Sequence, residues 1–252
     1  MSIFDQKVIK YEMKPLSSLE KVFPDETPVY RMECQMLSGL WGETVSFQVA
    51  YTGDFVMRER LDVRVVSELA EHVHVRTVEM VPVGRATNGI VDDNYLKTTS
   101  GLYPDLLKDL KDGKVIVYSR QWRSLWVDVD ITNEIPAGEY EIELQLIKEG
   151  EVVCSAKQKV TVIGTELPKL DIMHTEWMHA DCLADYYHVE VFSEEHWKLL
   201  ENYFQEYVKR DCNMMLTPLF TSPLDTAIGL ERTTCQLIDV EVKDGEYVFG
   251  FE

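Results

Sequence analysis

The sequence predicts a mainly β protein that begins with an antiparallel, immunoglobulin-like β-sandwich. Short segments in residues 1–165 alternate apolar and polar side chains, with almost no helical period. After Glu166-Leu167-Pro168 the pattern changes to strand, helix, strand and hairpin. A chain of 252 residues is long enough for one large domain or two modest ones. We therefore expect a β-sandwich domain over residues 1–166 and a second domain over residues 167–252.

The clearest strand signal lies in Thr44–Tyr51, where Val45, Phe47 and Val49 share one face and polar residues share the other. A period of two is typical of a half-buried strand. Strands are also predicted over Arg60–Val66, His72–Val83, Val115–Ser119, Leu125–Ile131, Gly138–Ile147 and Val152–Ile163. The last two are expected to form a hairpin, because Gly150 between them readily takes a positive φ.

One stretch of the first domain lacks this alternation. Arg85–Leu110 contains Asn88-Gly89 and Tyr103-Pro104-Asp105, which are typical of turns. The sequence predicts a long surface loop here, with a short helical turn over Leu106–Leu110.

The second domain starts with a predicted strand over Leu170–Trp177. A helix follows over Ser193–Arg210, with Ser193 as its cap and two glutamates in its first turn. A strand over Asn213–Leu219 then completes a βαβ unit with a parallel pair. The apolar stripe of the helix consists of Trp197, Leu200, Phe204, Tyr207 and Val208. A hairpin is predicted over Gln236–Val242 and Glu246–Phe251, around Asp244-Gly245.

Charge and composition exclude several classes of partner. The formal net charge is −19, so nucleic acid and anionic membrane surfaces are poor partners. No stretch approaches the 18 apolar residues of a membrane span, and the first residues show no secretory leader, so we expect a cytoplasmic protein. The five cysteines are widely spaced without a C-x-x-C pair, which favours reduced thiols over a zinc site or disulfides.

Several motifs resemble a known family. They are Gly101–Leu107 (GLYPDLL), Trp126–Val129 (WVDV), Ile135–Tyr140 (IPAGEY), Trp177–Tyr187 (WMHADCLADYY) and Met215–Thr226 (MLTPLFTSPLDT). In their order and spacing the chain, from about Gly42 onward, resembles glycoside hydrolase family 123 and its relatives. The resemblance implies a β-sandwich followed by a (β/α)8 barrel. It also implies removal of terminal N-acetylgalactosamine without a metal or other cofactor.

The family mechanism is substrate-assisted: the acetamido oxygen of the sugar attacks the anomeric carbon, and an adjacent Asp-Glu pair assists. A complete barrel needs at least about 200 residues, whereas only 83 follow Lys169. Asp25-Glu26, in the N-terminal part, is the one Asp-Glu neighbour pair of this sequence. We therefore expect an N-terminal fragment with an incomplete, truncated barrel, no catalytic residue of its own and no activity by itself.

The predicted sugar contacts follow the rule that barrel sites lie at the C-terminal ends of strands. Aromatic rings stack on sugar faces, and carboxylates and imidazoles bind hydroxyls. The candidates are Glu176, Trp177, His179, Asp181, Tyr186, Tyr187 and Asp225. The alternative is that Trp177 belongs to the core. A metal on His174, Glu176 and His179 is disfavoured, because the segment reads as a strand and not a helix.

A second hypothesis is a non-catalytic carbohydrate-binding or protein-interaction sandwich. Glycan binding that depends on Tyr103 or Trp122 rather than Trp177 would favour it. A two-stranded parallel remnant leaves open edges and apolar surface, which predicts self-association into a homo-oligomer through the exposed barrel strands.

Overall fold

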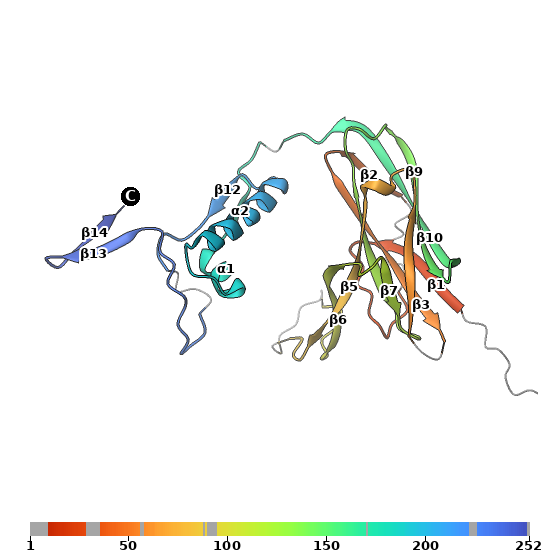
Figure 1. Ribbon diagram of the computed structural model, residues 1–252, viewed down its shortest axis with the longest axis horizontal. Coiled ribbons are helices and arrows are strands. Elements are labelled where there is room, and N and C mark those ends of the chain that lie inside the picture. The colour runs from red at the N-terminus through yellow and green to blue at the C-terminus, as the bar shows by residue number, and fades with distance from the viewer. Residues whose placement is uncertain are drawn as a thin grey trace, which may run out of the picture. The chain divides into compact units, whose positions relative to one another are not determined.

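A computed structural model describes residues 10–28, 36–55, 58–87, 89, 95–169, 171–221 and 226–250. It is mainly β, as predicted (Figure 1). The chain divides into two compact units, Met1–Leu167 (unit 1) and Pro168–Glu252 (unit 2). None of the helices in the described ranges is both long and apolar enough to cross a membrane.

Unit 1 contains two five-stranded sheets. One has the order β1-β3-β8-β5-β6 and the other β2-β10-β9-β4-β7. The strands are β1 Lys10–Ser17, β2 Met36–Trp41, β3 Thr44–Asp54, β4 Glu59–Val66, β5 Val73–Val83, β6 Gly101–Asp109, β7 Lys114–Val117, β8 Arg123–Asp130, β9 Gly138–Lys148 and β10 Glu151–Glu166. A short 3-10 helix, Ala70–His72, precedes β5. All the strands predicted in this region are present, with ends shifted by a few residues.

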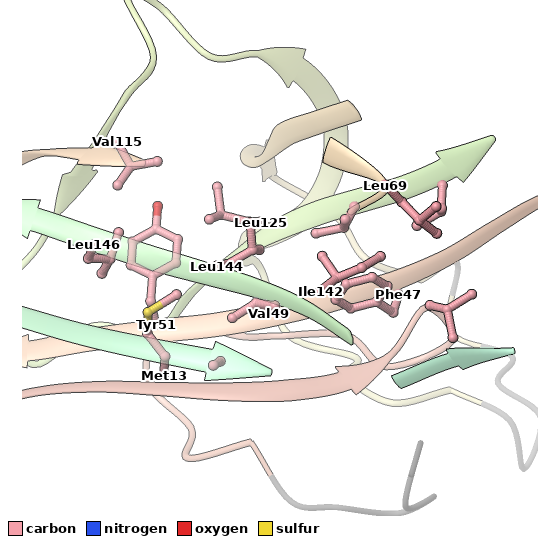
Figure 2. Packing of buried hydrophobic residues seen from close by; sticks show 14 of the residues in the cluster. Met13, Phe47, Val49, Tyr51, Leu69, Val115, Leu125, Ile142, Leu144 and Leu146 are labelled. Atoms are coloured by element: carbon pink, nitrogen blue, oxygen red, sulfur yellow. The ribbon is translucent and has the colours of Figure 1, made fainter. Parts of the chain in front are cut away.

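The apolar faces of both sheets enclose one core. Phe47 on β3 and Leu125 on β8 come from the first sheet, and Leu144 on β9 comes from the second; all three are fully buried. Figure 2 shows these side chains together with the ring of Tyr51. The alternation read in Thr44–Tyr51 therefore directs Phe47 and Val49 inward, and apolar burial of this kind is the main stabilising term of such a unit.

A second, smaller cluster covers the outer face of the first sheet. The segment after β1 brings Val22 against Leu16, Ala50 and Trp122. Gln48, predicted to face solvent, is buried beneath this segment, and its side-chain amide donates to the carbonyls of residues 17, 18 and 20. Trp122 is a buried core residue here, which removes it as a surface contact for a glycan.

Two features of unit 1 differ from the expectation. Residues Gly101–Asp109 form strand β6, so the predicted loop is shorter and the helical turn over Leu106–Leu110 is wrong. Pro104 is tolerated because β6 is an edge strand and its pairing with β5 is irregular at that point. The sandwich is also not entirely antiparallel, since β2 pairs with β10 in parallel.

A polar link joins the two sheets at one place. The Tyr11 hydroxyl on β1 donates to Glu59 on β4, and Lys148 Nζ on β9 lies 2.8 Å from the other Glu59 oxygen. Burial and the hydrogen bond to Glu59 raise the pKa of Tyr11 to about 12. Burial alone would raise the pKa of Glu59, but hydrogen bonds from Lys148 and Tyr11 outweigh it, and the pKa lies below its ordinary value of 4.5.

This link predicts a specific acid sensitivity of unit 1. Because the pKa of Glu59 is lower in the folded state, its ionised form stabilises the fold above pH 4.5, and that contribution is lost as the pH falls through the folded pKa. Urea unfolding from pH 7 to pH 3 should show the Glu59→Gln variant less stable than the parent at pH 7. The difference in stability should narrow as the pH falls below 4.5 toward 3, and a constant difference across this range would contradict the prediction.

Unit 2 contains a parallel pair, two helices and a hairpin. Its elements are β11 Thr175–Trp177, α1 Ala180–Tyr187, α2 Glu194–Lys209, β12 Met214–Leu216, β13 Asp239–Lys243 and β14 Glu246–Gly250. The predicted parallel pair, long helix and hairpin are confirmed, but both parallel strands are shorter than expected. The Ser193 hydroxyl accepts from the His196 amide, as a cap should.

The apolar stripe of α2 is only partly used. Leu200 is buried against Met178 and Leu183, and Tyr207 packs at the edge of that cluster. Trp197 is 49% exposed and Val208 is 69% exposed. A helix in unit 2 thus presents apolar side chains on its surface.

Candidate functional site

The C-terminal ends of β11 and β12 lie at one edge of unit 2. The strands run in parallel, with Trp177 opposite Leu216, and the Met178 amide extends the ladder by donating to the Leu216 carbonyl at 2.9 Å. His179 then stands at the N-cap position of α1 and Thr217 follows β12. Parallel strands bring the segments that follow them to the same edge.

A buried histidine fixes the start of α1. His196 on α2 is fully buried; its Nδ1 accepts from the Phe192 amide, and its Nε2 donates to the carbonyl of Ala180, both at 2.9 Å. These two bonds require the neutral ring with the proton on Nε2. The sequence analysis predicted no element over Ala180–Tyr187, but the structure has a helix there, and α2 holds its first residue.

The centre of the site is an ion pair that the sequence did not reveal. Arg232 donates from Nε to Asp181 at 2.5 Å and from Nη2 to the second carboxylate oxygen at 3.2 Å. The two side chains are only 11% and 10% exposed. A buried carboxylate requires such a partner, because an unpaired buried charge is strongly unfavourable.

Arg232 also orients His179. Its Nη2 lies 2.5 Å from Nδ1 of the imidazole. Arginine has only donors, so Nδ1 must be the acceptor, and the neutral ring carries its proton on Nε2. The arrangement therefore leaves His179 with one N–H donor, at a small cavity lined also by Thr217, Phe220 and Cys235.

The predicted contacts fall into two groups. Trp177 is 63% exposed, and its ring centroid lies 6.5 Å from that of His179, next to the ion pair of Asp181. Tyr186 and Tyr187 lie at the other end of α1, about 12 Å along a helix that rises 1.5 Å per residue. Tyr187 faces Tyr203 of α2, with 3.2 Å between the hydroxyl oxygens.

The remaining candidates lie apart from this centre. Glu176 is exposed and faces His174, whose Nε2 is 3.4 Å from a carboxylate oxygen. Asp225 lies outside the described residues. Within the residues that the structure does describe, no group of three His, Cys, Asp or Glu side chains is placed to hold a metal ion.

The sequence reasoning missed Arg232, Thr233 and His196. Thr233 Oγ1 donates to Asp185 at 2.6 Å, so the segment after residue 226 is attached to α1 at two points. Arg232 is one of only five basic residues from Asp171 onward, against 17 acidic ones. That scarcity was the available signal, since a buried acid in so acidic a segment needs one of these few cations.

The cysteines near the site should differ in reactivity. Cys182 is exposed, whereas Cys235 is buried and burial raises the pKa of its thiol. Because the thiolate is the reacting species, we expect iodoacetamide to modify Cys182 at least tenfold faster than Cys235 at pH 7.5. Peptide mass spectrometry after timed quenching measures both rates in one sample. Equal rates in the folded protein, with the same comparison in urea as control, would contradict the burial of Cys235.

Two comparisons with known proteins give matches. A family model described as the glycoside hydrolase 123 catalytic domain matches residues 177–252. The structure of a family 123 glycoside hydrolase from Clostridium perfringens is similar with a TM-score of 0.67 and 13% identity, over 96% of this chain and 43% of that one. The chain thus spans less than half the length of that protein.

Other similarities are weaker. A β-glucosidase from Listeria innocua has a TM-score of 0.29 and 10% identity, over 64% of this chain and 17% of that one. A search of curated proteins finds no match. The C-terminal sequence match and the similarity of fold agree: this chain resembles glycoside hydrolase family 123 in the sequence of residues 177–252 and in its fold.

Proposed function

We propose that this chain is the sandwich and the opening of the catalytic barrel of a glycoside hydrolase that acts on terminal 2-acetamido sugars. The observation that carries the proposal is the match of residues 177–252 to the glycoside hydrolase 123 catalytic domain. The substrate is the one that the family resemblance implies. The Clostridium perfringens relative is described in terms of glycolipid glycan hydrolysis, which fits a glycan as substrate.

The strand order supports an immunoglobulin-like sandwich over residues 1–166. The order β1-β3-β8-β5 corresponds to the A-B-E-D sheet of that fold, and β10-β9-β4 corresponds to its G-F-C sheet. For residues 167–252, the parallel strands β11 and β12 with helices between them support the first βαβ unit of a (β/α)8 barrel. The C-terminal edge of this pair is where a barrel binds its substrate.

We propose that the sugar contacts lie on the exposed side of this edge. Trp177 offers a ring for stacking, and His179 offers an N–H donor whose direction Arg232 fixes. Glu176, Tyr186 and Tyr187 are exposed and stay in the proposed set, with Asp225. Asp181 acts as a positioning residue, because both of its oxygens are bound by Arg232.

This chain alone is expected to be inactive. The substrate-assisted reaction of the family uses an adjacent Asp-Glu pair, and Asp25-Glu26 in unit 1 is the one such pair in the sequence. Both residues lie in unit 1, whereas the catalytic residues of a barrel lie at the C-terminal ends of the barrel strands. Incubation of the 252-residue chain with an aryl N-acetyl-β-galactosaminide should therefore release no phenol above the buffer rate, and steady turnover would overturn this part.

Binding is tested separately from turnover. Saturation-transfer NMR should detect binding of N-acetylgalactosamine to the full chain. The signal of galactose, which lacks the acetamide, should be at least fivefold weaker. Trp177→Ala should abolish the signal, whereas Trp197→Ala removes a tryptophan of similar exposure on α2 and should leave it. Binding that survives Trp177→Ala would instead favour the second hypothesis, a binding module in unit 1.

We also propose that unit 2 mediates self-association. Among the described residues β11 and β12 pair only with each other, so both present open edges. Trp197, Phe204 and Val208 add exposed apolar surface on α2. Light scattering after size exclusion should give a mass above 29.2 kDa, and Phe204→Lys should reduce it. A monodisperse monomer at 50 μM would overturn the proposal.

A further inference from the structure

A cleft lies wholly within unit 1. Its volume is about 810 Å³, which is within the usual range of ligand sites. Strands β5 and β6 of one sheet and β4 and β7 of the other contribute to its walls. Figure 1 shows β5, β6 and β7 at the same end of this unit.

The cleft exists because the chain changes sheets there. Strands β6 and β7 are edge strands of different sheets and are consecutive in the chain. The turn between them, residues 110–113, takes positive φ at Asp112 and Gly113. This turn joins the two sheet edges, and the side chains that line the cleft lie on the strands that flank it.

The walls of this cleft are basic in a strongly acidic protein. Six basic residues line it against three acidic ones, although the whole chain has 25 basic and 44 acidic residues. The six are Arg58, Arg60, Lys108, Lys111, Lys114 and Arg123. A concave surface whose charges are mostly of one sign concentrates the electrostatic field and attracts ligands of the opposite charge.

Part of this positive charge has no carboxylate beside it. Arg60 pairs with Asp112 at 2.9 Å and Lys114 pairs with Asp62 at 3.2 Å. Among the described residues, no carboxylate lies within ion-pair distance of Arg123, Lys108 or Lys111. On the acidic side, Glu59 is already bound by Tyr11 and Lys148.

Arg123 is the most constrained of these cations. It stands on β8 with its Cζ 4.9 Å from the centroid of the Tyr118 ring, and its Nη2 donates to Gln121 at 3.1 Å. Its Nε is buried and has no hydrogen-bond partner among the described residues. An unsatisfied buried donor is unfavourable, so this guanidinium has hydrogen-bonding capacity that the described residues leave unused.

The other walls suit a sugar ring. Leu102 and Ile116 are partly exposed apolar side chains, and Tyr118 adds an aromatic ring. Glu79 and Asp109 supply carboxylates that bind hydroxyl groups. A nucleic acid strand is a poor ligand for this cleft. Its phosphates outside the cleft would be repelled by a protein whose net charge is −19.

We propose that this cleft binds an anionic saccharide, a sugar that carries a carboxylate or sulfate group, with the anion on Arg123 and the rim lysines Lys108 and Lys111. The requirement for an anion rests on the cleft alone, and the choice of a saccharide rests also on the proposed function. The cleft lies in unit 1 and gives that unit a binding role of its own.

Titration calorimetry on the full chain tests this proposal. The probes are N-acetylneuraminic acid, N-acetylgalactosamine 6-sulfate, neutral N-acetylgalactosamine and sodium sulfate. At least one anionic sugar should bind at least tenfold more tightly than the neutral sugar or sulfate alone. Its affinity should fall between 50 and 300 mM NaCl, because the contact is charged.

Matched variants locate the site. Arg123→Gln should weaken binding of the anionic sugar at least tenfold, and Lys108→Gln, on an exposed edge strand, should weaken it several-fold without a risk to the fold. Lys159→Gln removes one charge from β10 outside the cleft and should leave binding unchanged. Trp177→Ala should leave binding of N-acetylneuraminic acid unchanged, so a failure of the proposed contacts in unit 2 is distinguishable from a failure of this cleft.

Three results would overturn the proposal. One is that neither anionic sugar binds. Another is that Arg123→Gln and Lys108→Gln behave like Lys159→Gln. The third is that inorganic sulfate binds as tightly as the sulfated sugar, which would leave an anion site with no preference for a saccharide.

Discussion

Replacing Arg232 by glutamine is expected to destabilise unit 2 by about 3–5 kcal/mol, because the change leaves the Asp181 carboxylate buried without its partner. The loss extends beyond one pair, since the same guanidinium orients His179. A unit of this size has a net stability comparable to that loss. We therefore expect α1 to become largely unprotected in hydrogen exchange, while the strands of unit 1 keep their protection.

Two variants control this result. Asp181→Asn combined with Arg232→Gln removes both charges and should recover part of the protection of Ala180–Tyr187, because an amide pair can still share a hydrogen bond. Lys243→Gln breaks an exposed ion pair with Glu241 and should leave exchange unchanged. Parent-like protection of α1 in Arg232→Gln would show that the ion pair does not hold this segment.

Replacing Phe47 by alanine is expected to destabilise unit 1 by about 3–5 kcal/mol. The ring is fully buried in the cluster to which both sheets contribute, so its removal leaves a cavity that the neighbouring strands cannot close (Figure 2). Urea unfolding followed by far-UV circular dichroism should show a lower midpoint with an unchanged slope.

Val152→Ala is the matched control for this variant. Val152 lies on β10 of the same unit but is 46% exposed, so its truncation should change the free energy of unfolding by less than about 0.5 kcal/mol. Similar effects of the two substitutions would contradict the assignment of Phe47 to the centre of the core.

The central strands could be predicted from the sequence, and most of the edge strands could not. Thr44–Tyr51 alternates because β3 has a neighbour on each side and turns its apolar face to the main core, while the segment after β1 covers its other face. The strands that were missed, β1, β2 and β6, all lie at the edge of a sheet. An edge strand tolerates proline, as at Pro15 in β1 and Pro104 in β6, so its sequence resembles a loop.

The candidate site was predicted in part. The rule that barrel contacts follow the strands identified Trp177, His179 and Asp181, which the structure places together at the end of β11. The same rule grouped Tyr186 and Tyr187 with these three residues, but the two tyrosines lie at the other end of α1. Helix α1 was not predicted, because an eight-residue helix depends on tertiary packing that a local sequence pattern does not show.

By itself, the sequence determined the mainly β class, the alternating core positions, the helix cap at Ser193 and the resemblance to family 123, because each is encoded locally or in ordered motifs. Only the tertiary structure decided that Gln48 is buried, that Arg232 neutralises Asp181 and orients His179, and that six basic residues line one cleft of unit 1. Each of these features depends on residues that are far apart in the chain. A charged side chain needs a partner only when it is buried, and it is buried only after the chain has folded.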